Sequence, residues 1–180
     1  MKKNLIYLLI LIALMAVFFV PGVRSFISET FFPVATINKA VTLSEEDYDV
    51  ELKGINTPNA NLKDFKGNKM LFLNFWGTWC APCRKEWPSI QQLYNGRKNK
   101  MDFVLIAMQD KEEDVRQFLK ENNYTVPVYI AQSPIGENIL PNVFPTTFIL
   151  DKNGRILQKE DATKDWNSEG VLQLIDSVSK

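Results

Sequence analysis

Two almost continuously apolar runs, residues 70–76 and residues 103–108, constrain the fold of this chain more than any other feature. Both are rich in residues that favour β-structure, and such runs are typical of strands buried on both faces of a sheet. Residues 82–97, which lie between them, carry apolar side chains at helical spacing. A strand, a helix and a second buried strand in this order indicate a sheet with helices packed against it.

Shorter elements extend this pattern along the chain. Val50 and Leu52 alternate as in a half-buried strand and lead into a turn at residues 57–59, which predicts an extra N-terminal β-hairpin. Asp110 is in position to cap the helix after the second buried strand. We therefore expect an α/β fold with a central mixed β-sheet flanked by helices. The later expected elements are a helix to about Asn122, a strand at residues 126–130, a hairpin with its turn at residues 151–154, and a last helix capped by Asn167 or Ser168.

The N-terminal segment, residues 1–25, predicts membrane targeting. The uncharged stretch from Leu5 to Val23 would span roughly 28 Å as a helix, against a hydrocarbon core of about 30 Å. It is either an uncleaved N-terminal transmembrane anchor, which we favour, or a cleaved signal peptide; a buried core helix is the third interpretation. Lys2 and Lys3 favour a cytoplasmic amino terminus, so both targeting interpretations send the following residues across the membrane.

Residues 26–47 show no sustained period and contain Pro33, so we expect a tether, the alternative being a strand or turn packed on the domain. Residues 48–180 are then the folded domain. The chain has 21 basic and 21 acidic residues, but Lys2, Lys3 and Arg24 belong to the apolar segment. The rest is therefore slightly acidic, which argues against a nucleic-acid partner.

The cysteine and histidine content narrows the possible chemistry. The chain has no histidine and only two cysteines, which excludes catalytic pairs and metal sites that need an imidazole and leaves at most one disulfide. Both cysteines lie where a buried strand gives way to a helix, as Cys80-Ala81-Pro82-Cys83. A helix N-terminus stabilises a thiolate at Cys80, and Pro82 suits the first helical turn.

The spacing of the two cysteines favours a redox couple. Cys83 lies one helical turn after Cys80, close enough to attack a mixed disulfide formed there. A structural zinc site would need two more ligands of a kind that the chain does not have. Two inert buried cysteines would leave the spacing unexplained. We therefore expect redox chemistry with no bound cofactor or metal.

Residues 74–83 resemble the active-site strand and loop of the thioredoxin superfamily, and residues 144–148 resemble its cis-proline loop. Residues 83–88 resemble the C-x-x-E-x-P helix start of the TlpA/ResA-like membrane-anchored thiol-disulfide oxidoreductases. Residues 165–168 are similar to the segment that leads into their last helix. The resemblance covers roughly residues 48–178 and implies a thioredoxin fold.

The resemblance also implies site residues. Cys80 would be the attacking thiol and Cys83 the buried resolving thiol. Pro145, expected to be cis, would pair with an extended substrate peptide, with Thr146 beside it in the same substrate-binding loop. The remaining expected contributors are the aromatic platform Trp76, Trp79 and Phe144, for which core packing is the alternative interpretation.

Departures from the family pattern affect the proton chemistry. Thioredoxins have a buried Asp where this chain has Asn74, and some TlpA/ResA-like proteins have Glu where it has Ala81. Glu86 is then the best remaining acid to assist proton transfer at Cys83, the alternatives being a water molecule as the assisting group or a solvated surface Glu with no such role.

An uncharged Ala81-Pro82 pair and the lack of histidine favour a reducing couple. We expect an extracytoplasmic enzyme at the inner (cytoplasmic) membrane, or secreted if the signal is cleaved, that reduces client-protein disulfides. The family implies apocytochrome c as a familiar client and a membrane protein as the electron donor. The alternatives are a general extracytoplasmic thiol oxidant, a thiol peroxidase, or a non-enzymatic membrane-tethered binding module.

Overall fold

The computed structural model describes Tyr7 and residues 41–178. The chain divides into two compact units, Met1–Lys39 and Ala40–Lys180. The expected anchor, apart from Tyr7, and most of the expected tether lie outside the described residues. Within the described part of the chain, every helix is too short or too polar to cross a bilayer.

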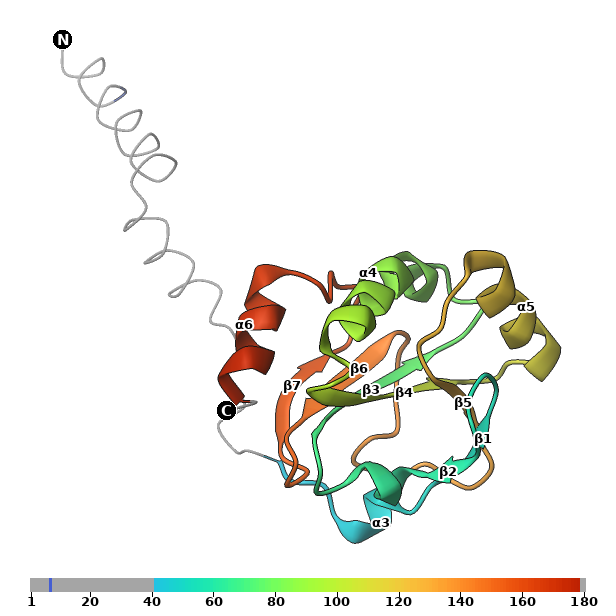
Figure 1. Ribbon diagram of the computed structural model, residues 1–180, viewed down its shortest axis with the longest axis horizontal. Helices are drawn as coiled ribbons and strands as arrows, with labels where there is room; N and C mark the ends of the chain where they lie inside the picture. Colours follow the sequence, from blue (N-terminus) through green and yellow to red (C-terminus); the bar gives the residue numbers. More distant parts are fainter. Residues whose placement is uncertain (1–6, 8–40, 179–180) are drawn as a thin grey trace. The chain divides into compact units, whose positions relative to one another are not determined.

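A mixed seven-stranded sheet forms the centre of the second unit, in the order β2-β1-β5-β4-β3-β6-β7 (Figure 1). The central strand β3 is parallel to β4 and antiparallel to β6. At one edge β1 pairs antiparallel with both β2 and β5. The strands are β1 Glu51–Gly54, β2 Ala60–Asn61, β3 Met70–Trp76, β4 Met101–Ala107, β5 Val128–Ala131, β6 Thr146–Leu150 and β7 Ile156–Glu160.

Alternating side chains of β3 build two hydrophobic cores, one on each face of the sheet. Phe72 and Trp76 join the first core, which receives the apolar faces of α4, α5 and α6. Leu71 and Phe75 join the second core, beneath α3 and η1. This burial on both faces confirms the α/β fold expected from the apolar run. The helices are α3 Glu45–Tyr48, the 3-10 helix η1 Leu62–Phe65, α4 Ala81–Arg97, α5 Glu112–Asn122 and α6 Glu169–Val178.

Residues 41–47 pack on the domain, as the alternative interpretation of the tether proposed. The carbonyl of Val41 accepts a hydrogen bond from the Ile156 amide at 2.9 Å, and the Leu43 amide donates to the Gly154 carbonyl at 3.0 Å. Gly154 has φ +79°, a conformation that glycine adopts readily. The folded domain therefore begins before Tyr48, because residues 41–43 pair with residues 154–156.

Asp47 ties α3 to the loop that precedes β6. Its carboxylate accepts hydrogen bonds from the Asn138 amide nitrogen and side chain and from the Ser44 backbone. Burial raises the pKa of this carboxyl, but the hydrogen bonds from Asn138 and Ser44 outweigh it and leave the pKa below its usual value. A Cβ at Gly136 would lie 2.5 Å from the Asp47 Cα, so glycine permits this close approach.

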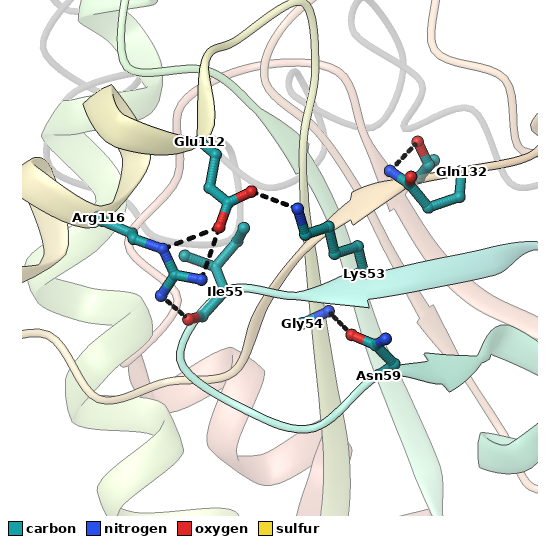
Figure 2. A network of polar contacts seen from close by, with 8 residues as sticks. Lys53, Gly54, Ile55, Asn59, Glu112, Arg116 and Gln132 are labelled. Carbon is teal, nitrogen blue, oxygen red and sulfur yellow. Dashed lines mark hydrogen bonds and ion pairs between the residues drawn. The ribbon is translucent and has the colours of Figure 1, made fainter.

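A polar network holds the first turn of α5 to strand β1 (Figure 2). Glu112 pairs with Lys53 at 2.5 Å and with Arg116 at 2.7 Å, and Arg116 also donates to the carbonyl of Ile55. Lys111 occupies the N-cap position of α5, and its side chain makes no capping hydrogen bond. The expected cap at Asp110 is therefore wrong, because that carboxylate binds a different loop.

Candidate active site

Cys80 and Cys83 form a disulfide at the start of α4 (Cys80–Cys83, S–S 2.06 Å). Cys80 is the N-cap residue of the helix, and its sulfur accepts a hydrogen bond from the Cys83 amide at 3.3 Å. Pro82 occupies the first turn, where its lack of an N–H costs no hydrogen bond. Cys80 is 5% exposed whereas Cys83 is completely buried, so an approaching molecule meets the first sulfur before the second.

Two aromatic rings frame the surface beside the disulfide. Trp79 is 52% exposed and stands edge-on against Phe144, with ring centroids 5.5 Å apart. Phe144 is joined to Pro145 by the cis peptide bond that the resemblance implied. Thr146 follows as the first residue of β6, and its buried hydroxyl lies 2.8 Å from Asp161 Oδ1. This part of the described chain thus combines an accessible aromatic surface with a proline loop.

Trp76 does not belong to that surface. It is completely buried in the first core, with its ring centroid 4.5 Å from that of Trp87 and 5.3 Å from that of Phe118. The expected contribution of Trp76 to a substrate platform is corrected here, since β3 is covered on both faces and its last residue points into the core.

Glu86 lies in α4, three residues after Cys83, and is buried with 1% of its surface exposed. Its carboxylate accepts hydrogen bonds from the Asn74 side chain and the Trp166 indole, both at 3.0 Å, and from the Lys164 amide at 3.4 Å. Burial raises the pKa of Glu86 to about 7, although these hydrogen bonds favour the charged form. The solvated-surface interpretation of Glu86 is therefore wrong.

Asn74 supports this carboxylate from the central strand. Its side-chain amide donates to Glu86 and, at 2.8 Å, to the Thr147 hydroxyl. Its own Oδ1 is buried and has no hydrogen-bond partner among the described residues. The substitution of Asn for the Asp of thioredoxins therefore places a neutral amide beside a carboxylate that comes from α4.

Sequence reasoning missed several of these contacts. The Trp166 indole was part of a segment that resembled the family, but nothing in the sequence showed that it binds Glu86. The Thr78 amide and hydroxyl donate to the Asp110 carboxylate, a contact that the sequence does not show because an Asp just before a helix is typical of a cap. In neither case does the sequence contain a signal for the partner residue.

The arrangement has the parts needed for thiol-disulfide exchange. A sulfur at a helix N-terminus is stabilised as a thiolate once the disulfide is reduced. A second sulfur lies one turn further along the helix. Glu86, three residues after Cys83, lies on the neighbouring part of the same helical surface and has a pKa close to neutrality.

Comparison with known proteins agrees with this chemistry. Residues 40–175 match the Redoxin family model. The thiol-disulfide oxidoreductase ResA of Bacillus thuringiensis subsp. konkukian is 40% identical over 122 residues, covering 63% of this chain and 67% of that protein. ResA of Geobacillus thermodenitrificans is 30% identical over 145 residues, covering 79% of this chain and 82% of that protein.

A solved structure extends the similarity to the fold. StoA from Bacillus subtilis superposes with a TM-score of 0.57 at 24% identity, over 77% of this chain and 98% of that chain. With the Redoxin match over most of its length and ResA proteins among its relatives, this chain belongs to the Redoxin family and is a thiol-disulfide oxidoreductase of the ResA type.

Proposed function

We propose that this protein reduces disulfides of client proteins outside the cytoplasm, with Cys80 as the attacking thiol and Cys83 as the resolving thiol. The observation that supports this most is the unequal placement of the two sulfurs. The Cys80 sulfur caps α4 and its residue keeps 5% of its surface exposed, whereas Cys83 is completely buried. Only the first can reach a sulfur of another protein without unfolding the helix.

The reaction transfers two electrons to the client. The Cys80 thiolate attacks one sulfur of the client disulfide, forming an intermolecular disulfide and releasing a client thiolate, which takes up a proton. Cys83 then loses its proton and attacks Cys80, which breaks the intermolecular bond and releases the second client thiol. The client is reduced, and the protein is left with the Cys80–Cys83 disulfide seen in the structure.

We assign the proton from Cys83 to the Glu86 carboxylate, directly or through one water molecule. A base is most effective when its pKa is near the working pH, and the pKa of Glu86 is about 7. The three donors around this carboxylate hold it in place while it exchanges its proton. Asn74 cannot act as the base, because an amide does not titrate.

Client docking is assigned to the surface around Trp79 and the proline loop. Trp79 and Phe144 offer an apolar contact for residues beside the client cysteine. Pro145 and Thr146 would present the loop backbone for pairing with an extended peptide, as in the family. Trp76 is left out of this assignment since it is buried.

We also propose a cellular location and partners for the protein. Residues 1–25 would anchor the chain in the cytoplasmic membrane and place the domain on its outer side, where a membrane protein would return two electrons to the disulfide. Apocytochrome c is the proposed client class by resemblance. The uncharged Ala81-Pro82 pair and the lack of histidine support a reducing direction.

The test is to trap clients on the full chain in its native host. Cys83→Ser removes the resolving thiol, so client proteins should accumulate as disulfide-linked adducts on Cys80, to be identified by mass spectrometry after purification without reductant. The matched control is the double variant Cys80→Ser/Cys83→Ser, which should capture none. If the single variant captures no more protein than the control, the proposed client reduction is wrong.

A further inference from the structure

The turn that carries Cys80 is hydrogen-bonded to the loop after β4. Within residues 77–80 the Cys80 amide donates to the Gly77 carbonyl at 3.1 Å, which makes Thr78 and Trp79 the two corner residues of a four-residue turn. The geometry of this turn decides where the Cys80 sulfur lies relative to the N-terminus of α4.

Both corners of the turn are held from the same loop. The Thr78 amide and hydroxyl donate to the two carboxylate oxygens of Asp110, at 2.6 and 2.7 Å. The Trp79 indole donates to the carbonyl of Met108 at 3.1 Å. The Met108 amide in turn donates to the carbonyl of Trp76 at 2.8 Å, so the loop is fixed to the end of β3.

The loop after β4 has a residue with a strained backbone at its centre. Gln109, between Met108 and Asp110, has φ +52°, a left-handed conformation that is uncommon for residues other than glycine. Such strain persists only where surrounding contacts hold the backbone in place, and it concentrates at functional sites. Here the contacts on either side of Gln109 are the ones made to the cysteine-bearing turn.

We propose that Asp110 is a positioning residue that holds the Thr78 corner so that the Cys80 sulfur stays at the N-terminus of α4. The inference deepens the proposed function, since it rests on Cys80 as the attacking thiol. A thiolate gains from the helix N-terminus only while its sulfur remains within hydrogen-bond distance of the free N–H groups, here the Cys83 amide at 3.3 Å. A loosened turn lets the sulfur move away and lowers the thiolate fraction.

The experiment measures the reactivity of Cys80 directly and needs no client. In the full chain carrying Cys83→Ser, Cys80 is the sole thiol, and its alkylation by iodoacetamide is followed from pH 5 to pH 10. Asp110→Ala should slow alkylation at pH 7 about three- to tenfold, corresponding to the loss of one helix-terminus interaction, with an unchanged rate at high pH where the thiol is fully ionised.

Three further variants separate positioning from charge. Asp110→Asn keeps an oxygen that can accept from Thr78, so its alkylation at pH 7 should be slowed less than threefold, consistent with a single retained hydrogen bond. Thr78→Val should slow alkylation in the same direction as Asp110→Ala, and Thr78→Ser should restore the rate of the parent. The control is Asp114→Ala, an exposed carboxylate in the first turn of α5, which should match the parent.

Specific results would overturn the inference. A pH profile of Asp110→Ala that coincides with that of Asp114→Ala would show that Asp110 does not position the turn. Faster alkylation in both Asp110→Ala and Asp110→Asn would show that it acts through its negative charge instead. If Asp110→Ala does not fold, the two Thr78 variants test the inference in its place. A pH profile of Thr78→Val that coincides with that of Thr78→Ser would then overturn it. Failure to trap clients with Cys83→Ser would count against the proposed function and leave these rates unaffected.

Discussion

Replacement of Glu86 by Gln tests whether the buried carboxylate makes the stability of the domain depend on pH. The pKa of Glu86 is raised from 4.5 to about 7 on folding, with burial as the largest cause. Below pH 4.5 the group is neutral in both the folded and the unfolded chain. As pH rises towards 7, the unfolded chain releases this proton and the folded chain retains it, so the folded state loses stability.

The size of this loss follows from the two pKa values. Between them, each pH unit lowers the free energy of unfolding by about 1.4 kcal/mol. From pH 5 to pH 8.5 the contribution of Glu86 should therefore fall by about 2.5 kcal/mol, nearly all of it before the pH passes the folded-state pKa by one unit.

Gln should remove this loss without disrupting the site. Its carbonyl can accept from the Trp166 indole, and its amide can donate to Asn74 if that side chain turns its unpartnered Oδ1 towards it. Thr147 can then donate to the same oxygen, because a hydroxyl both donates and accepts. The variant thus keeps similar hydrogen bonding and carries no titrating group.

The assay is urea unfolding of the oxidised full chain in a nonionic detergent, followed by tryptophan fluorescence, for the parent and Glu86→Gln at half-unit steps from pH 5 to pH 8.5. The advantage of the Gln variant over the parent should grow by about 2.5 kcal/mol across this range. A difference that stays constant with pH would refute the reasoning. In the reduced protein, the same variant should also abolish the dependence of Cys83 reactivity on a group that titrates near pH 7.

Three other changes test separate contacts. Trp166→Phe removes a donor that favours the charged form of Glu86, so the pH at which the free energy of unfolding stops falling should move upward in the same urea series. If that pH is the same as in the parent, the reasoning is contradicted. Trp79→Ala should raise the KM for a client disulfide about tenfold, as loss of an aromatic contact predicts; an unchanged KM would exclude Trp79 from docking. Gly136→Ala should lower the unfolding free energy by about 1–3 kcal/mol, because its Cβ would meet Asp47, and a variant as stable as the parent would show that the loop yields without cost.

The fold could be predicted where consecutive apolar residues indicate a buried strand. The bounds of β3 coincide with the apolar run at residues 70–76, since a strand covered on both faces needs apolar side chains at nearly every position. The start of α4 at the cysteine motif was also evident. The sequence does not show how residues 41–47 pack, because their pairing partners, such as Ile156, lie more than a hundred positions away.

The site could be predicted only in part, for a related reason. The spacing of Glu86 from Cys83 was visible, but its burial depends on Trp166, 80 positions further along the chain. Asp110 resembles a local helix cap in the sequence, since its true partner, Thr78, lies 32 positions earlier. Polar residues whose partners are distant give the same sequence signal as surface residues, and only the fold distinguishes them.

The reduction potential of the Cys80–Cys83 couple tests the proposed reducing function most directly. The full chain would be equilibrated with glutathione buffers of defined ratio, and the fraction of reduced protein would be determined by thiol alkylation and mass spectrometry. With no histidine and no charge between the cysteines, we predict a potential well below about −180 mV, towards the roughly −270 mV of thioredoxin. A value near about −120 mV, as for a strong thiol oxidant, would contradict the account.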